Sequence, residues 1–178
     1  SRIPHQLTYT FQRPLREAAA FAACCNGRCH FSGKVHTALI SLHTLASGSE
    51  GNSLLVSAGG THILVDAGIS ARRITAALLS LGLTPGDIAG VLVTHEHSDH
   101  ISGLQTLVKR HRIPIYASPA TACQLAWRIA GIGPMLREVQ RLTPFTVGAA
   151  RITPFETSHD AAGSIDYRID AAGGSVGI

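Results

Sequence analysis

Three histidines and an aspartate lie within six residues in the middle of this chain, at His95, His97, Asp99 and His100. They directly follow an apolar run at 91–93, which is typical of a buried strand. Imidazole nitrogens and carboxylate oxygens are the donors that bind zinc, manganese and iron in proteins. An extended backbone would place His95 and His97 on one side, whereas the adjacent Asp99 and His100 cannot share a face. The spacing therefore predicts two metal ions side by side.

Two simpler explanations of the cluster are a set of surface histidines and a structural zinc site. Exposed histidines are common, but four donor side chains in six positions after an apolar strand are hard to explain as surface decoration. Structural zinc sites are usually closed tetrahedra rich in cysteine, and residues 95–100 contain no cysteine. The cluster therefore favours a metal site of the catalytic type.

The same residues carry a resemblance to a family of metal-dependent hydrolases. The pattern His95-x-His97-x-Asp99-His100 is similar to the signature of the metallo-β-lactamase-fold hydrolases. The order of four segments resembles the YycJ/WalJ branch of that superfamily, a group of bacterial cytoplasmic proteins regarded as exonuclease-like. These segments are SGSEGNS at 47–53, ILVDAG at 63–68, THEHSDH at 94–100 and TSHDA at 157–161. The resemblance runs from residue 39 to residue 178.

The resemblance implies a set of five metal ligands. His95, His97 and His159 would hold the first ion, and Asp99 and His100 the second. Taken alone, His159 would be an ordinary loop histidine, but its place at the end of an apolar strand matches the third ligand position of the family. The implied cofactors of the intact protein are two divalent transition metals, zinc or manganese.

Two neighbouring segments have a structural and a functional interpretation. Asp66 follows an apolar strand and could cap the helix that begins after Ser70, but the resemblance implies that it lies under the site and orients a histidine. The loop that contains Ser49 and Asn52 could be a plain turn. Its backbone N–H groups could also cradle a phosphate, so Ser49 and Asn52 are candidates for substrate contact.

The apolar periodicity predicts a mixed α/β chain. Helices are expected from Ser70 to Gly82, over 101–111 and over 119–130, and Cys123 and Trp127 on the last of these are expected to face the core. Strands are expected at 39–45, 53–57, 62–66, 90–94, 114–117, 151–157, 165–169 and 175–178. The resemblance implies an αββα sandwich of the metallo-β-lactamase type, with only its N-terminal part present.

Charge and periodicity divide the chain at residue 36. Residues 1–36 carry five Lys or Arg against one acidic residue, whereas residues 37–178 carry ten of each. The first segment lacks apolar periodicity, so we expect a poorly packed extension before an incomplete domain at 37–178. Its cysteines and His30 match zinc-site spacings poorly, and the cysteines are interpreted as free thiols of a cytoplasmic protein. No apolar run approaches the ~20 residues of a membrane span, so no membrane partner is expected.

The predicted chemistry is metal-assisted hydrolysis, in which bound cations lower the pKa of a water molecule and Asp99 helps to orient it as the nucleophile. By resemblance the substrate is a nucleic-acid phosphodiester. Two alternatives stay open: the same fold acting on a thioester, a lactone or a small phosphodiester, and a non-catalytic metal-binding or regulatory module. The resemblance also implies an aspartate and a histidine ligand after residue 178, so this chain is expected to be a fragment that binds one metal firmly at most. No oligomeric state is predicted.

Overall fold

Seven strands form the larger of two β-sheets in the computed structural model, which describes residues 8–11, 40–161, 163–172 and 174–178. The strand order is β1-β2-β3-β4-β5-β6-β7, antiparallel from β1 to β4 and parallel from β4 to β7. The strands are β1 (Thr8–Phe11), β2 (Ile40–Ala46), β3 (Ser53–Ala58), β4 (Thr61–Val65), β5 (Ile88–Leu92), β6 (Ile115–Ala117) and β7 (Leu136–Glu138).

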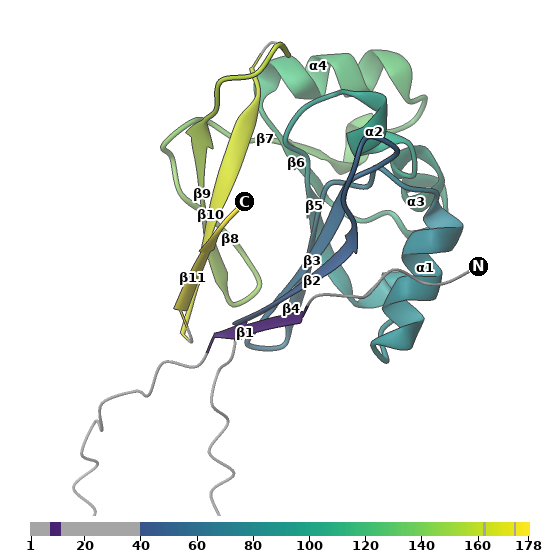
Figure 1. Cartoon of the computed structure of the whole chain (residues 1–178). Coiled ribbons are helices and arrows are strands. Elements are labelled where there is room, and N and C mark those ends of the chain that lie inside the picture. The colour runs from purple at the N-terminus through teal and green to yellow at the C-terminus, as the bar shows by residue number, and fades with distance from the viewer. Residues whose placement is uncertain (1–7, 12–39, 162, 173) are drawn as a thin grey trace, which may run out of the picture.

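Helices cover one face of this sheet, as Figure 1 shows. Parallel neighbours need crossover connections, and these supply the helical layer. The helices are α1 (Ala71–Ser80), α2 (Ser98–Ile101), α3 (Leu104–His111) and α4 (Pro119–Arg128), with short 3-10 turns η1 (Pro85–Asp87) and η2 (Gly133–Met135). Ser70 caps α1 and Ser118 caps α4, each accepting a hydrogen bond from a backbone N–H of the first turn.

Four antiparallel strands form the smaller sheet, which lies along the other face of the larger one in Figure 1. Its order is β11-β10-β9-β8. The strands are β8 (Phe145–Val147), β9 (Ala150–Glu156), β10 (Ile165–Ala171) and β11 (Gly174–Gly177). The described residues thus form three layers: helices, the larger sheet and the smaller sheet. The predicted mixed α/β fold class is confirmed.

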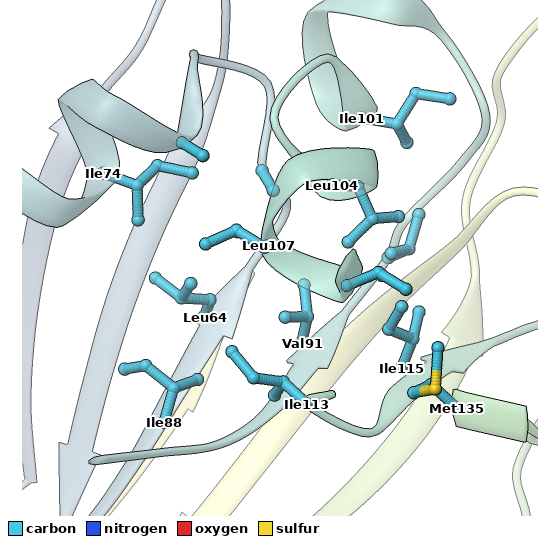
Figure 2. Packing of buried hydrophobic residues seen from close by; sticks show 14 of the residues in the cluster. Leu64, Ile74, Ile88, Val91, Ile101, Leu104, Leu107, Ile113, Ile115 and Met135 are labelled. Atoms are coloured by element: carbon cyan, nitrogen blue, oxygen red, sulfur yellow. The ribbon is translucent and has the colours of Figure 1, made fainter. Parts of the chain in front are cut away.

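Two apolar clusters hold these layers together. Figure 2 shows the first, in which Ile74 of α1 and Leu107 of α3 lie over Leu64 and Val91 of the larger sheet. The second fills the space between the sheets and includes Tyr167, which is fully buried. The Tyr167 hydroxyl donates to the backbone oxygen of Val93 at 2.8 Å, which ties β10 to the chain just before the histidine cluster. Burial of this hydroxyl raises the pKa of Tyr167 well above its usual value of 10.

The hairpin, the capped helix and the predicted strands lie where the sequence places them, with boundaries shifted by at most two residues. The helix expected at 101–111 is broken, because Gly103 donates its N–H to the oxygen of Ala67 and packs against that backbone. Strands β1, β7 and β8 are not among the predicted strands. The expectation that Cys123 and Trp127 face the core is wrong. The buried side of α4 is made by Thr121, Ala122 and Leu125, which leaves both residues exposed.

The proposed boundary at residue 36 stays a prediction. Residues 8–11 form the edge strand β1, which pairs with β2, and residues 12–39 lie outside the described residues. The cysteines of the N-terminal segment and His30 also lie outside them. Within the described part of the chain, no helix is long and apolar enough to cross a membrane.

Candidate metal centre

The candidate site lies where the central parallel strands end. Strands β4 and β5 run side by side in the same direction, so the residues that follow them meet at one edge of the sheet. Asp66 comes directly after β4, and His95 and His97 follow β5 on an extended loop that leads into α2. His159 follows β9 of the smaller sheet. The site is therefore built from both sheets.

Three histidines converge at this edge. One ring nitrogen from each of His95, His97 and His159 lies within 4.8 Å of the other two. Within the described residues, these three side chains are close enough to hold one metal ion together. The ring centres of His95 and His159 are 4.2 Å apart, although 64 positions separate them in sequence. His95 is buried, His97 is half-buried and His159 is exposed. The cluster thus has a closed inner side and an open outer side.

The environment keeps His95 neutral at physiological pH. Burial, followed by the neighbouring His100 and His159, lowers the pKa of His95 to about 4. A neutral imidazole is the form that binds a metal, because the ligand nitrogen must carry a free lone pair. The donor set is therefore three imidazoles, at least one of which is held ready for coordination.

A buried carboxylate, Asp66, organises the inner side of the cluster. One of its oxygens accepts from the backbone N–H of Thr94 at 2.9 Å. The other accepts from the Thr94 hydroxyl at 2.8 Å and lies 2.7 Å from Nδ1 of His100. The Thr94 hydroxyl has a single proton, which it uses to donate a hydrogen bond to Asp66. In its 2.9 Å contact with Nδ1 of His95 the hydroxyl must therefore be the acceptor, so Nδ1 of His95 carries the proton. Asp66 thus fixes Nδ1–H on both rings and leaves both Nε2 atoms as acceptors.

The predicted pair Asp99 and His100 lies next to the three histidines. Nε2 of His100 is 3.4 Å from a carboxylate oxygen of Asp99, and the His95 and His100 ring centres are 4.0 Å apart. Burial alone would lower the pKa of His100, but the hydrogen bond and charge of Asp66, together with the charge of Asp99, outweigh it and raise this pKa. Two donors at this position fall short of a closed metal site, so a second ion would need further ligands or water.

Asn52 positions Asp99 from the loop after β2. Its Nδ2 donates to Asp99 at 3.2 Å and lies 3.2 Å from Nε2 of His100, while its Oδ1 accepts from the N–H of Gly48. The backbone N–H of Asn52 also donates to the oxygen of Asp99 at 2.7 Å. Ser49 is exposed on the same loop. Of the two predicted substrate-contact residues, Asn52 therefore bonds to the donor cluster.

A carboxylate that the sequence reasoning did not select holds His159. An oxygen of Asp160 lies 2.6 Å from Nδ1 of His159 and 4.0 Å from Nδ1 of His97. The arrangement repeats the Asp66–His100 contact on the exposed side of the cluster. The sequence does contain one indication of this role, because Asp160 directly follows the candidate ligand His159. Histidines that bind metals usually donate their second N–H to a carboxylate or carbonyl.

The loops around the site pack backbone to backbone at Gly68. A Cβ at this position would overlap the carbonyl of Asp99 and would lie 2.6 Å from the backbone nitrogen of Asn52. The N–H of Gly68 donates to the oxygen of Asn52 at 2.8 Å. Glycine at position 68 therefore lets the loops after β2 and β4 reach the start of α2.

These residues fit a divalent transition metal. Three imidazoles from two segments converge, and the burial of His95 favours its neutral form. The carboxylate of Asp66 orients the neighbouring ring of His100. The sequence model of the metallo-beta-lactamase superfamily matches residues 46–174, which is more than half of the chain. The chain belongs to this superfamily.

Known proteins place the chain more closely within the superfamily. It is 38% identical over 124 residues to the exodeoxyribonuclease YycJ of Bacillus anthracis, covering 69% of this chain and 47% of the relative. It is 35% identical over 127 residues to the exodeoxyribonuclease WalJ of Streptococcus pneumoniae, covering 70% and 47%. A ribonuclease Z from Methanopyrus kandleri is 31% identical over 124 residues, covering 66% and 43%. The chain spans about half the length of these curated relatives, and the predicted resemblance to the YycJ/WalJ branch is confirmed.

Solved structures support the same fold. The Rm3 metallo-beta-lactamase superposes with a TM-score of 0.63 at 25% identity, covering 76% of this chain and 56% of that one. A metallo-beta-lactamase from Cronobacter sakazakii superposes with a TM-score of 0.65 at 21% identity, covering 75% and 57%.

Proposed function

We propose that the protein is a metal-dependent hydrolase of nucleic-acid phosphodiester bonds that acts from a strand end. The observation that carries the proposal is the convergence of His95, His97 and His159 within 4.8 Å, beside Asp99 and His100. In this proposal the three histidines hold one divalent metal, zinc or manganese, and Asp99 with His100 contributes to a second. A bound divalent metal supplies Lewis acidity and lowers the pKa of a coordinated water.

The protein's own residues prepare the donor set in this proposal. Asp66 and Thr94 keep Nδ1 of His95 and His100 protonated, so that each ring presents Nε2. Asn52 holds the Asp99 carboxylate from one side, and Asp99 would orient the attacking water. Ser49, exposed on the same loop, is a candidate for contact with the substrate.

The choice of nucleic acid over other esters rests on the relatives. The two exodeoxyribonucleases and the ribonuclease Z are between 31% and 38% identical to this chain over 124–127 residues. Phosphodiester hydrolysis also suits a site with two adjacent metal positions, because paired cations stabilise both the attacking and the leaving oxygens.

The proposal is tested on the protein in its full encoded length. End-labelled single-stranded and duplex DNA and RNA are incubated with Zn²⁺ or Mn²⁺, with a thioester and a lactone in parallel. We expect mononucleotide release from the labelled nucleic acid, abolished by His97→Ala and by EDTA, and unchanged by His111→Ala on the last turn of α3. Turnover of the thioester or lactone with nucleic acid untouched would overturn the assignment. Inactivity on every substrate, with metal bound, would point to a non-catalytic module.

A further inference from the structure

The last turn of α4 carries an exposed tryptophan beside an exposed arginine. Trp127 is 85% exposed, although tryptophan is a residue that folded proteins bury for most of its area. It is the single tryptophan of the chain. Arg128 donates one guanidinium N–H to the backbone oxygen of Glu96 at 2.8 Å, and the structure gives its other N–H groups no partner within the described residues. Neither side chain is therefore explained by packing.

Helix α4 lies against both loops that carry the three histidines. At its C-terminal end, the bond from Arg128 reaches Glu96, which stands between His95 and His97. At its N-terminal end, a Cβ on Gly163 of the His159 loop would lie 2.7 Å from Cβ of Ala120. The helix thus forms one wall of the site, and Figure 1 shows it along that edge of the molecule.

The Glu96 side chain next to this wall is also not explained by packing alone. Glu96 is buried, and its Oε2 has no hydrogen-bond partner among the described residues. A buried carboxylate oxygen without a partner is costly, so this loop conformation is held by other contacts, of which the Arg128 bond is one. Arg128 is thereby held beside the metal donors, with the remaining N–H groups of its guanidinium available.

An indole face and a free guanidinium are the two groups that bind a single nucleic-acid strand. Aromatic side chains stack on successive bases with little sequence preference, and each stacked base contributes about 1–3 kcal/mol. Arginine binds phosphate through paired N–H donors in a fixed planar geometry. Trp127 and Arg128 are neighbours on the last turn of α4, and the hydrogen bond from Arg128 to Glu96 places this turn next to the loop that carries His95 and His97.

We propose that Trp127 and Arg128 form a strand-binding subsite, in which Trp127 stacks on an unpaired base and Arg128 holds an adjacent phosphate of the strand that enters the metal centre. The inference rests on the proposed nucleic-acid substrate and adds how that substrate is held. It also gives a role to Trp127, which the packing of α4 leaves in solvent.

Because Trp127 is the only tryptophan, its fluorescence reports this subsite directly. The 178-residue chain is titrated with a twelve-nucleotide oligothymidylate in EDTA, so that the strand stays intact, and again with Zn²⁺. Binding is measured in parallel by anisotropy of a labelled strand for the parent chain, Trp127→Ala, Trp127→Phe and Arg128→Ala. Arg110→Ala is the matched cation control, since it lies near the start of β6, at the sheet edge opposite the site.

We expect saturable quenching of the indole emission on binding. Trp127→Ala should weaken affinity about tenfold, Trp127→Phe by less than about threefold, and Arg110→Ala by no more than the loss of any one surface cation. A strand of the same length with abasic sites should lose its sensitivity to Trp127→Ala and keep its sensitivity to Arg128→Ala.

Three results would overturn the inference. Strand binding by the parent chain with unchanged indole emission and no effect of Trp127→Ala would refute the subsite and leave the proposed function standing. Protection of Trp127 from acrylamide in the free chain would show that protein already covers it. Absence of nucleic-acid binding by this chain, together with absence of cleavage by the full-length protein, would refute both proposals.

Discussion

The carboxylate of Asp66 lies 2.7 Å from Nδ1 of His100, a residue 34 positions later in the chain. The same carboxylate oxygen accepts a hydrogen bond from the Thr94 hydroxyl. The Thr94 oxygen in turn accepts a hydrogen bond from Nδ1–H of His95. One buried carboxylate thus sets the tautomers of two histidines that belong, in our proposal, to different metal ions. This places Asp66 at the junction of the two halves of the site.

Asp66→Asn should weaken metal binding while leaving the fold nearly intact. Asp66 has a left-handed backbone with φ of 58°, which asparagine tolerates, so the substitution removes the charge without new strain. The side-chain amide would donate where the carboxylate accepts, and His100 would move its proton to Nε2. Loss of such an orienting partner typically costs 10–100-fold in metal affinity. Zinc affinity measured against a chromophoric chelator should fall within that range.

Asp66→Ala serves as the contrasting variant. It also leaves the buried Thr94 donors without an acceptor and puts alanine at a left-handed position, so its free energy of unfolding should drop by about 2–4 kcal/mol. Equal zinc affinity in the parent chain and in Asp66→Asn would show that Asp66 does not orient the site.

Thr94→Val tests the relay to His95 separately. Valine has nearly the shape of threonine but cannot accept the Nδ1 proton of His95, while the backbone N–H at position 94 still bonds to Asp66. We expect zinc affinity to fall about tenfold, with a loss of about 1–2 kcal/mol in the free energy of unfolding. Thr121→Val, at a buried threonine of α4 whose hydroxyl accepts from Ser118, provides the control for stability. A stability loss without any change in zinc affinity would contradict the relay.

Gly68→Ala should disturb the site more than its small size suggests. The added methyl group would overlap the carbonyl of Asp99, so the start of α2 would have to move away from the loop after β4. We expect a lower melting temperature and a loss of metal affinity that exceeds the loss caused by Gly86→Ala, where a methyl group meets nothing closer than 3.5 Å. Differential scanning fluorimetry with and without Zn²⁺ measures both effects, and a Gly68→Ala chain that matches the parent would show that the contact can relax.

Acid should destabilise the metal-free chain through His95. Its pKa is lowered to about 4 in the folded state, so between pH 6.5 and pH 4 the unfolded state binds the proton more readily. Stability is therefore unaffected by this group above pH 6.5 and is lost as the pH falls, by at most about 3 kcal/mol. His100 acts in the opposite sense, because its raised pKa makes the folded state bind the proton more readily, so its contribution to stability is fully present below pH 6.5 and is lost as the pH rises above that value.

Urea unfolding of the chain in EDTA at several pH values measures this slope. His95→Gln should flatten it, whereas His111→Gln, at an exposed position, should leave it unchanged. An identical pH profile for the parent chain and His95→Gln would refute the assignment.

The local pattern predicts more of this molecule than the long-range contacts. The strands predicted at 62–66 and 90–94 end at polar residues, and Asp66, His95 and His97 lie at or just after those ends. The third histidine could be selected only through the family resemblance, because its closeness to His95 depends on how the smaller sheet packs on the larger one. Thr94, Asp160 and the role of Asn52 depend on hydrogen-bond geometry, which no spacing encodes.

Trp127 is a residue for which the local pattern predicts the wrong environment. Its apolar character and helical position indicate the core, but Thr121, Ala122 and Leu125 take the inner side of α4. Function can thus be easier to see where a local rule fails, since an exposed indole needs a partner that the core does not supply.

The most direct test of the account is the zinc stoichiometry and affinity of His159→Ala. His159 is exposed and comes from a different sheet than His95 and His97, so its removal should leave folding intact while opening the three-histidine group. We predict that the parent chain binds one zinc ion tightly, that His159→Ala binds at least about tenfold more weakly, and that His111→Ala matches the parent. Undiminished zinc affinity in a folded His159→Ala chain would contradict the metal centre proposed here.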